Sequence, residues 1–426
     1  AVILHNTIAF PVSLMALLQI EANPLILHAS TTENEVERMS KNIGIRWVLK
    51  DDIDLNSINS REKWLEIGKV NLCIYPNDTE GNTIPEKGVI LHQTSGTYGR
   101  PLQCIRNQKV AVAEAVNYVS SIKQFDKITI RVTTPLNHAF AYGFGLISSI
   151  ITDSNMIIDT SFNPKKVLNE ETKNVSDILC VVPPMLESLI YFKQADDSFQ
   201  LPHSVYYAGT MCAPSLKDKF ETTFGSELFA ILGSTETGAI ACSNSNNGKA
   251  NGVGKILNNV NVSIKNTGKY KDLGENIGEL YVKSTSMMQR YCDERFPKEI
   301  DCFSTGDLAK FDENNDLHII GRIKDIINVG GAKVDPVEVE KVLLEYQGID
   351  DAIVYSGCSE NRNEIVLAAI SSNEDLDESS ILDFCAKRLN HYKIPRRINI
   401  LKDIPRTPSG KCLKPKLPGY NENKIF

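Results

Sequence analysis

Thr94–Pro101 combines hydroxyl side chains and glycines in a composition suited to holding phosphate. It reads Thr-Ser-Gly-Thr-Tyr-Gly-Arg-Pro and follows the apolar run Val89–Leu91. Glycine lets the backbone approach an anion closely, and hydroxyl and amide groups can donate hydrogen bonds to phosphate oxygens. The segment lacks the Gly-Lys-Ser/Thr ending of a Walker loop. A surface turn is the alternative, because Ser and Gly also favour turns.

A second segment, Gly233–Gly238, places a carboxylate among hydroxyls. It reads Gly-Ser-Thr-Glu-Thr-Gly and follows the apolar run Leu228–Leu232. Glu236 at the end of a strand could bind a Mg²⁺ ion that also coordinates phosphate oxygens. A capping box at the start of a helix is the alternative, since Ser/Thr and Glu are the residues that form one.

Asp307 and Arg322 stand in two turn-like segments, Ser304–Asp307 and Gly321–Asp325. An Asp after a tight turn can accept hydrogen bonds from both hydroxyls of a ribose, and an Arg can bind the sugar or a phosphate. A pair of ordinary turns is the alternative.

Pro405–Lys411 contains two prolines and one glycine and ends in a lysine. A lysine presented by such a constrained loop could neutralise charge that develops on a phosphoryl group. An exposed basic tail is the alternative for this segment.

The order and spacing of these segments resemble the superfamily of acyl-CoA synthetases, nonribosomal-peptide adenylation domains and luciferases. The resemblance covers essentially the whole chain. Its matching parts are a phosphate loop at Thr94–Pro101, a Tyr-Gly-x-Thr-Glu segment at Gly233–Gly238, a Thr-Gly-Asp ribose site at Ser304–Asp307, a hinge and helix at Gly321–Glu340, and a Pro-Arg-Thr-x-x-Gly-Lys loop at Pro405–Lys411.

The resemblance implies ATP and Mg²⁺ as cofactors and a reaction in two steps. A carboxylate attacks the α-phosphorus of ATP and expels pyrophosphate, and a thiol then attacks the acyl-adenylate. The resemblance assigns the β- and γ-phosphates to Thr94, Ser95, Gly96, Thr97 and Gly99, and it adds Gly233 and Ser234 to the residues that bind the nucleotide. It assigns the α-phosphate or the substrate carboxylate to Thr235, and Mg²⁺ to Glu236.

The remaining roles implied by the resemblance fall in the last third of the chain. Asp307 and Arg322 would hold the ribose, and Lys411 would bridge the substrate carboxylate and the α-phosphate. Lys324 would be the hinge of a rotating C-terminal domain. Gly330 and Gly331 would line the tunnel for the thiol.

Pro135–Gly145 stands where the superfamily places its acyl pocket. The expected pocket residues are His138, Ala139, Phe140, Tyr142, Gly143, Ala208 and Gly209. The stretch has no carboxylate, and an α-ammonium group buried without a partner would be costly. We therefore expect an aryl or fatty acid without an α-amino group. An amino-acid-activating enzyme remains an alternative, and the aromatic side chains could simply belong to the core.

Two positions depart from the pattern of the superfamily. Leu102 stands where the phosphate loop usually has a lysine, and Leu232 stands where an aromatic residue usually stacks on adenine. Arg100 or Arg106 could substitute for the missing lysine. A catalytically weakened relative that binds a nucleotide or a partner protein is therefore an alternative of another class.

Composition and charge narrow the range of partners. The formal charge of −7 argues against a nucleic-acid binder, which usually has a basic face. The stretch Lys387–Lys416 contains ten Lys or Arg residues and only one acidic residue, Asp403. This stretch suits the phosphates of CoA or an acidic carrier protein. Only 15 residues follow Lys411, so we expect the acceptor to be free CoA or a separate carrier protein.

Cysteine usage and the absence of long apolar runs predict the compartment. The ten cysteines include no Cys-x-x-Cys pair, which disfavours a metal site or a disulfide framework. Unpaired thiols fit a reducing compartment. The first residues lack the pattern of a signal peptide, and no run reaches the length of a membrane span. We expect a cytoplasmic enzyme.

Apolar runs that alternate with amphipathic stretches must position these residues. The first part of the chain predicts a βαβα pattern with a parallel sheet, at Ala1–Leu4, Ala9–Glu21, Leu25–His28, Thr32–Gly44 and Trp47–Leu49. Short strands are expected at Val260–Ile264, Gly278–Lys283 and Leu317–Ile320, followed by a compact α+β segment.

The fold class predicted is α/β. A large N-terminal domain, residues 1–321, would contain parallel α/β subdomains and a small β-barrel, with its extreme N-terminus apparently missing. A small mobile α+β C-terminal domain, residues 325–426, would follow the hinge at Lys324.

Overall fold

The structure, a computed structural model, divides into two compact units. It describes residues 1–51, 63–77, 81, 84–94, 102–122, 125–173, 175–245, 248–249, 252–293, 295, 300–359, 364–406 and 412–420. The larger unit comprises Ala1–Asn261 and Lys283–Phe303, and the smaller unit comprises Val262–Val282 and Ser304–Phe426. The smaller unit thus includes strands that precede Lys324, and the domain boundary expected at this residue stays a prediction.

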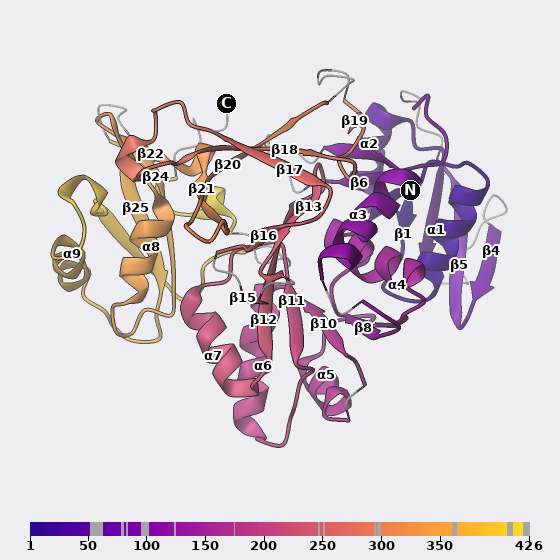
Figure 1. The fold of residues 1–426 in the computed structure, drawn as a ribbon, viewed down its shortest axis with the longest axis horizontal. Coiled ribbons are helices and arrows are strands. Elements are labelled where there is room, and N and C mark those ends of the chain that lie inside the picture. Colours follow the sequence, from indigo (N-terminus) through magenta and orange to yellow (C-terminus); the bar gives the residue numbers. More distant parts are fainter. Residues whose placement is uncertain are drawn as a thin grey trace. The chain divides into compact units, whose positions relative to one another are not determined.

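The first sheet of the larger unit has a parallel centre (Figure 1). Its eight strands run in the order β19-β7-β6-β2-β1-β3-β5-β4, and β6, β2, β1 and β3 are parallel. The strands are β1 (Val2–Ile3), β2 (Leu25–Leu27), β3 (Trp47–Asp51), β4 (Lys63–Ile67), β5 (Val70–Pro76), β6 (Val89–Gln93), β7 (Gln103–Asn107) and β19 (Arg290–Tyr291).

Helices α1 (Ala9–Gln19) and α2 (Glu33–Ile43) connect the parallel strands, which confirms the βαβα pattern. Thr32 and Glu35 form a complete capping box at the start of α2, and Gly44 ends the helix at a φ of 58°.

The second sheet carries the predicted acyl segment and Glu236. Its seven strands run in the order β16-β13-β12-β11-β10-β8-β9, with β9, β8, β10, β11 and β12 parallel. The strands are β8 (Thr129–Val132), β9 (Asn155–Ile158), β10 (Ile178–Val181), β11 (Ser204–Tyr207), β12 (Glu227–Ser234), β13 (Gly238–Cys242) and β16 (Lys255–Ile256). The short strands β14 (Asn244–Ser245) and β15 (Gly248–Lys249) pair with each other.

The helices of this part of the larger unit are α3 (Gln108–Ser121), η2 (Ala141–Ile147), α4 (Ser148–Ile151), α5 (Pro164–Glu171), α6 (Pro183–Ala195) and α7 (Pro214–Phe224). Apolar side chains of α5, α6 and α7 pack with those of β10, β11 and β12 into one buried cluster. This burial is the main contribution that holds the helices on the sheet.

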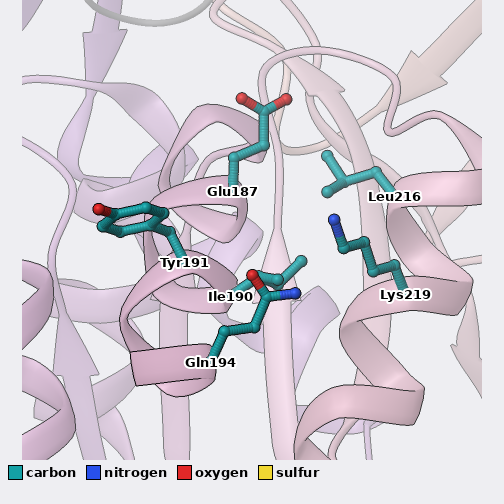
Figure 2. A pocket seen from close by; sticks show the side chains of 6 residues that line it. All are labelled: Glu187, Ile190, Tyr191, Gln194, Leu216 and Lys219. Atoms are coloured by element: carbon teal, nitrogen blue, oxygen red, sulfur yellow. The ribbon is translucent and has the colours of Figure 1, made fainter. Parts of the chain in front are cut away.

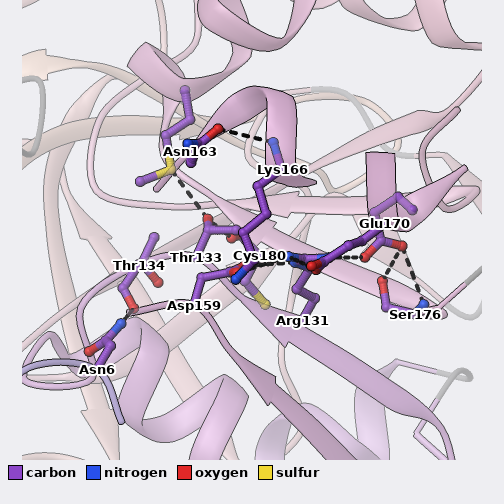
Figure 3. Close-up of polar contacts among 12 residues, drawn as sticks. Asn6, Arg131, Thr133, Thr134, Asp159, Asn163, Lys166, Glu170, Ser176 and Cys180 are labelled. Carbon is purple, nitrogen blue, oxygen red and sulfur yellow. Dashed lines mark hydrogen bonds and ion pairs between the residues drawn. The ribbon is translucent and has the colours of Figure 1, made fainter. Parts of the chain in front are cut away.

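Arg131 on β8 is fully buried and holds three carboxylates (Figure 3). Its Nε and Nη2 donate to Asp159 at 2.6 and 2.8 Å, its Nη1 donates to Glu171 at 3.0 Å, and its Nη2 donates to Glu170 at 2.7 Å. Burial alone would lower the pKa of Arg131, but the hydrogen bonds to Asp159 and Glu171 raise it. The network therefore keeps a charged guanidinium that ties β8 to α5 and to the end of β9.

The loop that follows β8 is also fixed by hydrogen bonds. The Thr133 hydroxyl donates to the Cys180 carbonyl at 2.6 Å. The amide side chain of Asn6, which follows β1, donates to the Thr134 carbonyl and accepts from the Leu136 N–H, both at 2.8 Å. Residues of both sheets thus hold the chain that leads to His138.

The smaller unit begins with a four-stranded sheet in the order β17-β18-β20-β21. Its strands are β17 (Val260–Lys265), β18 (Gly278–Ser284), β20 (Phe303–Phe311) and β21 (Leu317–Arg322). In place of the expected small barrel, the hydrogen bonds within the described residues form this open sheet, because β17 and β21 lie at opposite edges.

The rest of the smaller unit is the predicted α+β segment. It contains the hairpin β22 (Ile327–Val329) and β23 (Ala332–Val334), the helices α8 (Pro336–Leu344) and α9 (Glu378–Ala386), and the sheet of β24 (Asp351–Cys358), β25 (Glu364–Ser371) and β26 (Arg397–Leu401). Side chains of α8 and α9 share one buried apolar cluster with the three-stranded sheet. Across the described residues, no helix is long and apolar enough to span a membrane.

Replacing Arg131 by Met should lower the free energy of unfolding by about 3–5 kcal/mol, because Asp159 and Glu171 would stay buried without a cation. Lys166→Met is the matched control. Lys166 approaches the same Asp159 at 3.4 Å, but its side chain is 53% exposed, so its loss should cost less than about 1 kcal/mol. Urea unfolding of both variants measures the difference, and equal losses would contradict a structural role for the Arg131 network.

Candidate functional site

Glu236 lies in a tight turn between β12 and β13. In this turn Ser234 pairs with Gly238, and the Thr237 N–H donates to the Ser234 hydroxyl at 3.2 Å. A Cβ at Gly233 would lie 2.7 Å from the Gly238 carbonyl oxygen, and Gly238 has a φ of 67°, so both glycines are required. The alternative of a helix capping box is wrong, because a strand follows the turn.

The Glu236 side chain is held through one of its two carboxylate oxygens. The carboxylate is buried, and the Tyr291 hydroxyl donates to its Oε1 at 3.0 Å. The Met288 N–H donates to the Glu236 carbonyl at 2.7 Å. Tyr291 belongs to none of the sequence motifs, and the pairing of β19 with β7, which places it here, is evident only in the structure.

The two ends of the predicted phosphate loop are hydrogen-bonded to each other. The Thr94 N–H donates to the Leu102 carbonyl at 2.7 Å, and the Leu102 N–H donates to the Thr94 hydroxyl at 3.1 Å. Ser95, Gly96, Thr97 and Gly99, which were assigned to phosphate, lie outside the described residues. The turn with Glu236 and the base of this loop are neighbours, because Tyr291 donates to Glu236 and its side chain packs with Leu102 and Cys104.

The structure explains why a leucine fits at position 102, but the described residues do not replace the lysine that the superfamily usually has there. Leu102 is buried in a cluster with Cys104, Met288 and Tyr291. Arg106 is buried as well, and its Nη2 lies 2.5 Å from Glu114. The idea that Arg106 could replace the usual lysine is therefore wrong, and Arg100 lies outside the described residues.

Asp307 and Arg322 face each other across β20 and β21 in the smaller unit. They are partners in the strand register, and Arg322 Nε lies 2.8 Å from Asp307 Oδ1. Burial raises the pKa of Asp307 although Arg322 opposes the shift. The nearby Lys324 has a pKa lowered by burial, and Lys414 forms an ion pair with Asp325 at 3.0 Å. The structure thus brings together the predicted ribose residues and the predicted hinge.

The residues that flank the predicted catalytic loop are also paired. Arg406 and Cys412 form an antiparallel bridge, and the Leu413 N–H donates to the Pro405 carbonyl at 2.8 Å. Lys411 itself lies outside the described residues. Gly330 and Gly331, assigned to the thiol tunnel, form the turn between β22 and β23 with φ values of 59° and 101°.

The predicted acyl segment enters an unusual helix. Ala141–Ile147 is a π-helical segment, a form that often marks functional sites. His138 is exposed and Ala139 and Phe140 are half-buried, whereas Tyr142 and Gly143 are buried.

Part of this segment belongs to the core, as the alternative interpretation held. The ring of Tyr142 lies 5.0 Å from that of His92, and a Cβ at Gly143 would lie 2.8 Å from the Glu114 carboxyl carbon. Ala208 and Gly209 directly follow β11, and Gly209 has a φ of 96°.

A surface groove lies between α6 and α7 of the larger unit. Figure 2 shows its lining side chains, which are Glu187, Ile190, Tyr191, Gln194, Leu216 and Lys219. No residue of the predicted site lines it, so it adds nothing to the assignment.

The donor set around Glu236 fits one kind of metal site. Within the described ranges, no group of three or more His, Cys, Asp or Glu side chains is placed to hold a metal. A protein cage for a metal is therefore not formed by these residues. Mg²⁺ usually needs only one or two carboxylates together with water and substrate phosphates, and Glu236 can supply one carboxylate.

Comparison with known sequences gives two family matches. The profile described as "AMP-binding enzyme" matches residues 1–292, and that described as "AMP-binding enzyme C-terminal domain" matches residues 338–411. A 3,4-dihydroxybenzoate–[aryl-carrier protein] ligase of Bacillus anthracis is 31% identical over 333 residues, which are 78% of this chain and 73% of that protein. A probable CoA ligase, CCL9, of Humulus lupulus is 23% identical and covers 95% of this chain and 83% of that protein.

Solved structures share the fold. ATP-bound MatB from Rhodopseudomonas palustris matches with a TM-score of 0.79 at 18% identity, over 97% of this chain and 86% of that one. O-succinylbenzoate CoA synthetase (MenE) from Bacillus subtilis, in complex with ATP and magnesium ion, matches with a TM-score of 0.75 at 21% identity, over 98% and 88%. These likenesses establish the α/β architecture.

Proposed function

We propose that this chain, which belongs to the AMP-binding enzyme family, acts on an aryl or fatty acid without an α-amino group. The chain activates a carboxylic acid with ATP as an acyl-adenylate, and the acyl group is then transferred to a thiol. The observation that carries the assignment of ATP-dependent activation is the buried Glu236 carboxylate. It is held beside Thr94 and Leu102, the two hydrogen-bonded ends of the predicted phosphate loop.

In this proposal the larger unit binds the phosphates and the acid. The segment that starts at Thr94 holds the β- and γ-phosphates, and Thr235 contacts the α-phosphate or the substrate carboxylate. Glu236 would hold Mg²⁺, which when bound neutralises phosphate charge and so favours attack on the α-phosphorus. The hydrogen bonds between Thr94 and Leu102 support this role, because they fix both ends of the phosphate segment.

The smaller unit would supply the ribose contact and the catalytic lysine. Asp307 accepts hydrogen bonds from the ribose hydroxyls, and Arg322 holds Asp307 and the nucleotide. Lys411 neutralises charge during adenylation, and rotation at Lys324 then brings the Gly330–Gly331 turn to the thiol tunnel. The pairing of Arg406 with Cys412 supports a defined position for the segment that carries Lys411.

The proposal that the substrate has no α-amino group rests on which carboxylates lie near the acyl segment. Pro135–Gly145 contains none. Glu114 lies behind Gly143, but it is buried and pairs with Arg106, so its charge is already compensated. A substrate ammonium would find no free counter-charge in this part of the described chain. The half-buried Phe140 and the small Ala139 suit an apolar acyl group.

The thiol belongs to CoA or to the phosphopantetheine of a carrier protein. Both kinds of acceptor occur in the names of the relatives. Lys393 and Lys414 pair with carboxylates within the smaller unit, whereas Arg396, Arg397 and Lys402 are exposed, which suits contact with phosphates or an acidic carrier. None of the ten cysteines, all of which are described, forms a disulfide, and this supports a cytoplasmic location.

Acid-dependent exchange of labelled pyrophosphate into ATP tests the substrate class. A benzoate or phenylpropanoate should be activated at least about a hundredfold faster than phenylalanine, because a desolvated ammonium without a counter-charge costs several kcal/mol. Matched pairs of amino and des-amino acids are the control for size. A preference for the amino acid would overturn the proposed class, and no exchange with any acid would favour the weakened relative.

Asp307→Ala should raise the dissociation constant of ATP at least about tenfold, because two ribose hydroxyls would lose a charged acceptor and each such bond is worth roughly 1.5–3 kcal/mol. Asp301→Ala is the control, since that carboxylate is exposed. Titration calorimetry of both variants measures the effect. Unchanged ATP affinity in a folded Asp307→Ala variant would remove Asp307 from the site.

A further inference from the structure

Tyr291 is a buried residue whose position is set by three sets of contacts. On β19 it pairs with Cys104 of β7, and its side chain packs with Leu102, Cys104 and Met288. The neighbouring Arg290 binds Glu86 through two hydrogen bonds of 2.8 Å. The ring and the backbone of this strand therefore have little freedom to move.

The segment before Tyr291 also binds the turn that carries Glu236. The Met288 N–H donates to the Glu236 carbonyl at 2.7 Å, and the Ser286 hydroxyl donates to the Thr237 carbonyl at 3.1 Å. Arg106 Nη2 donates to the Ser286 carbonyl at 3.3 Å. Backbone and side chain of Glu236 are thus held by one short segment that is remote in sequence.

The hydroxyl of Tyr291 selects one oxygen of the carboxylate. It donates to Glu236 Oε1 at 3.0 Å, and no described residue donates to Oε2. A hydrogen bond to one oxygen fixes the rotation of the carboxyl group and leaves the other oxygen with its lone pairs. Hydrogen bonds of this kind orient metal ligands and typically change metal affinity about 10–100-fold.

We propose that Tyr291 is a positioning residue of the nucleotide site, whose hydroxyl orients Glu236 so that Oε2 can bind Mg²⁺ when ATP is present. The inference rests on the proposed function, because it needs Glu236 to be the metal ligand. Leu102 has a part in it, since the leucine at this position packs against the ring of Tyr291.

Tyr291→Phe tests the proposal, because it removes the hydroxyl and keeps the ring in its apolar cluster. The dissociation constant of ATP, measured by titration calorimetry with Mg²⁺, should rise about tenfold. The constant measured in EDTA without Mg²⁺ should stay unchanged. A loss of affinity that is equal with and without Mg²⁺ would show a general structural role and overturn the proposal, as would no change in either condition.

Tyr281→Phe is the matched control. The Tyr281 hydroxyl likewise donates to a carboxylate, that of Glu279 at 3.1 Å, and Tyr281 belongs to the smaller unit, whereas Glu236 belongs to the larger one. This variant should bind ATP like the wild type in both conditions.

A double-mutant cycle separates action through Glu236 from other effects. In a Glu236→Gln background, Tyr291→Phe should change ATP·Mg²⁺ affinity by less than about twofold, since coupled residues are not additive. Additive losses would contradict the proposal. If wild-type affinity for ATP does not depend on Mg²⁺ at all, the metal role of Glu236 in the proposed function fails instead.

Discussion

A buried carboxylate at a strand turn is the constraint on which the larger unit is built. Removing a charge from water is costly unless hydrogen bonds or a cation compensate it. For Glu236 the compensation comes from Tyr291, while the Met288 N–H holds its backbone. The turn itself needs glycine at positions 233 and 238, because side chains there would collide with the Gly238 carbonyl or Ser286. The pairing of β19 with β7 places Tyr291 at the base of the predicted phosphate loop.

Other buried charges of the larger unit serve the scaffold. Arg131 on β8 pairs with Asp159 and Glu171, and Arg106 pairs with Glu114, which lies against Gly143 of the acyl segment. Such pairs contribute less to stability than their number suggests, but breaking one is costly. The difference from Glu236 is chemical, since each of these acids already has a cation. A carboxylate that is oriented by a neutral donor remains available for a metal.

The sequence predicted the parallel core and the motifs better than the contacts between distant segments. Alternating apolar runs were sufficient for the βαβα pattern, and the helix predicted at Thr32–Gly44 corresponds to α2, whose capping box of Thr32 and Glu35 is seen in the structure. The turn at Ser234 looked equally like a helix cap, because hydroxyls and a glutamate serve both, and only the following β13 decides. The sequence alone leaves Arg106 open as a phosphate ligand, because it does not reveal that this side chain is buried against Glu114. Tyr291 could not be found, since its partner strand β7 lies far away in the chain.

Transfer of labelled oxygen from the acid to AMP tests the central claim most directly. The carboxylate of an accepted acid is labelled with ¹⁸O, and the products formed with ATP and a thiol are analysed by mass spectrometry. Attack of a carboxylate oxygen on the α-phosphorus places that oxygen in the acyl-adenylate, and thiol attack on the carbonyl carbon releases it with AMP. The account predicts one labelled oxygen in AMP and none in pyrophosphate. Label in inorganic phosphate, with ADP as the other product, would mean an acyl phosphate route and would contradict the account.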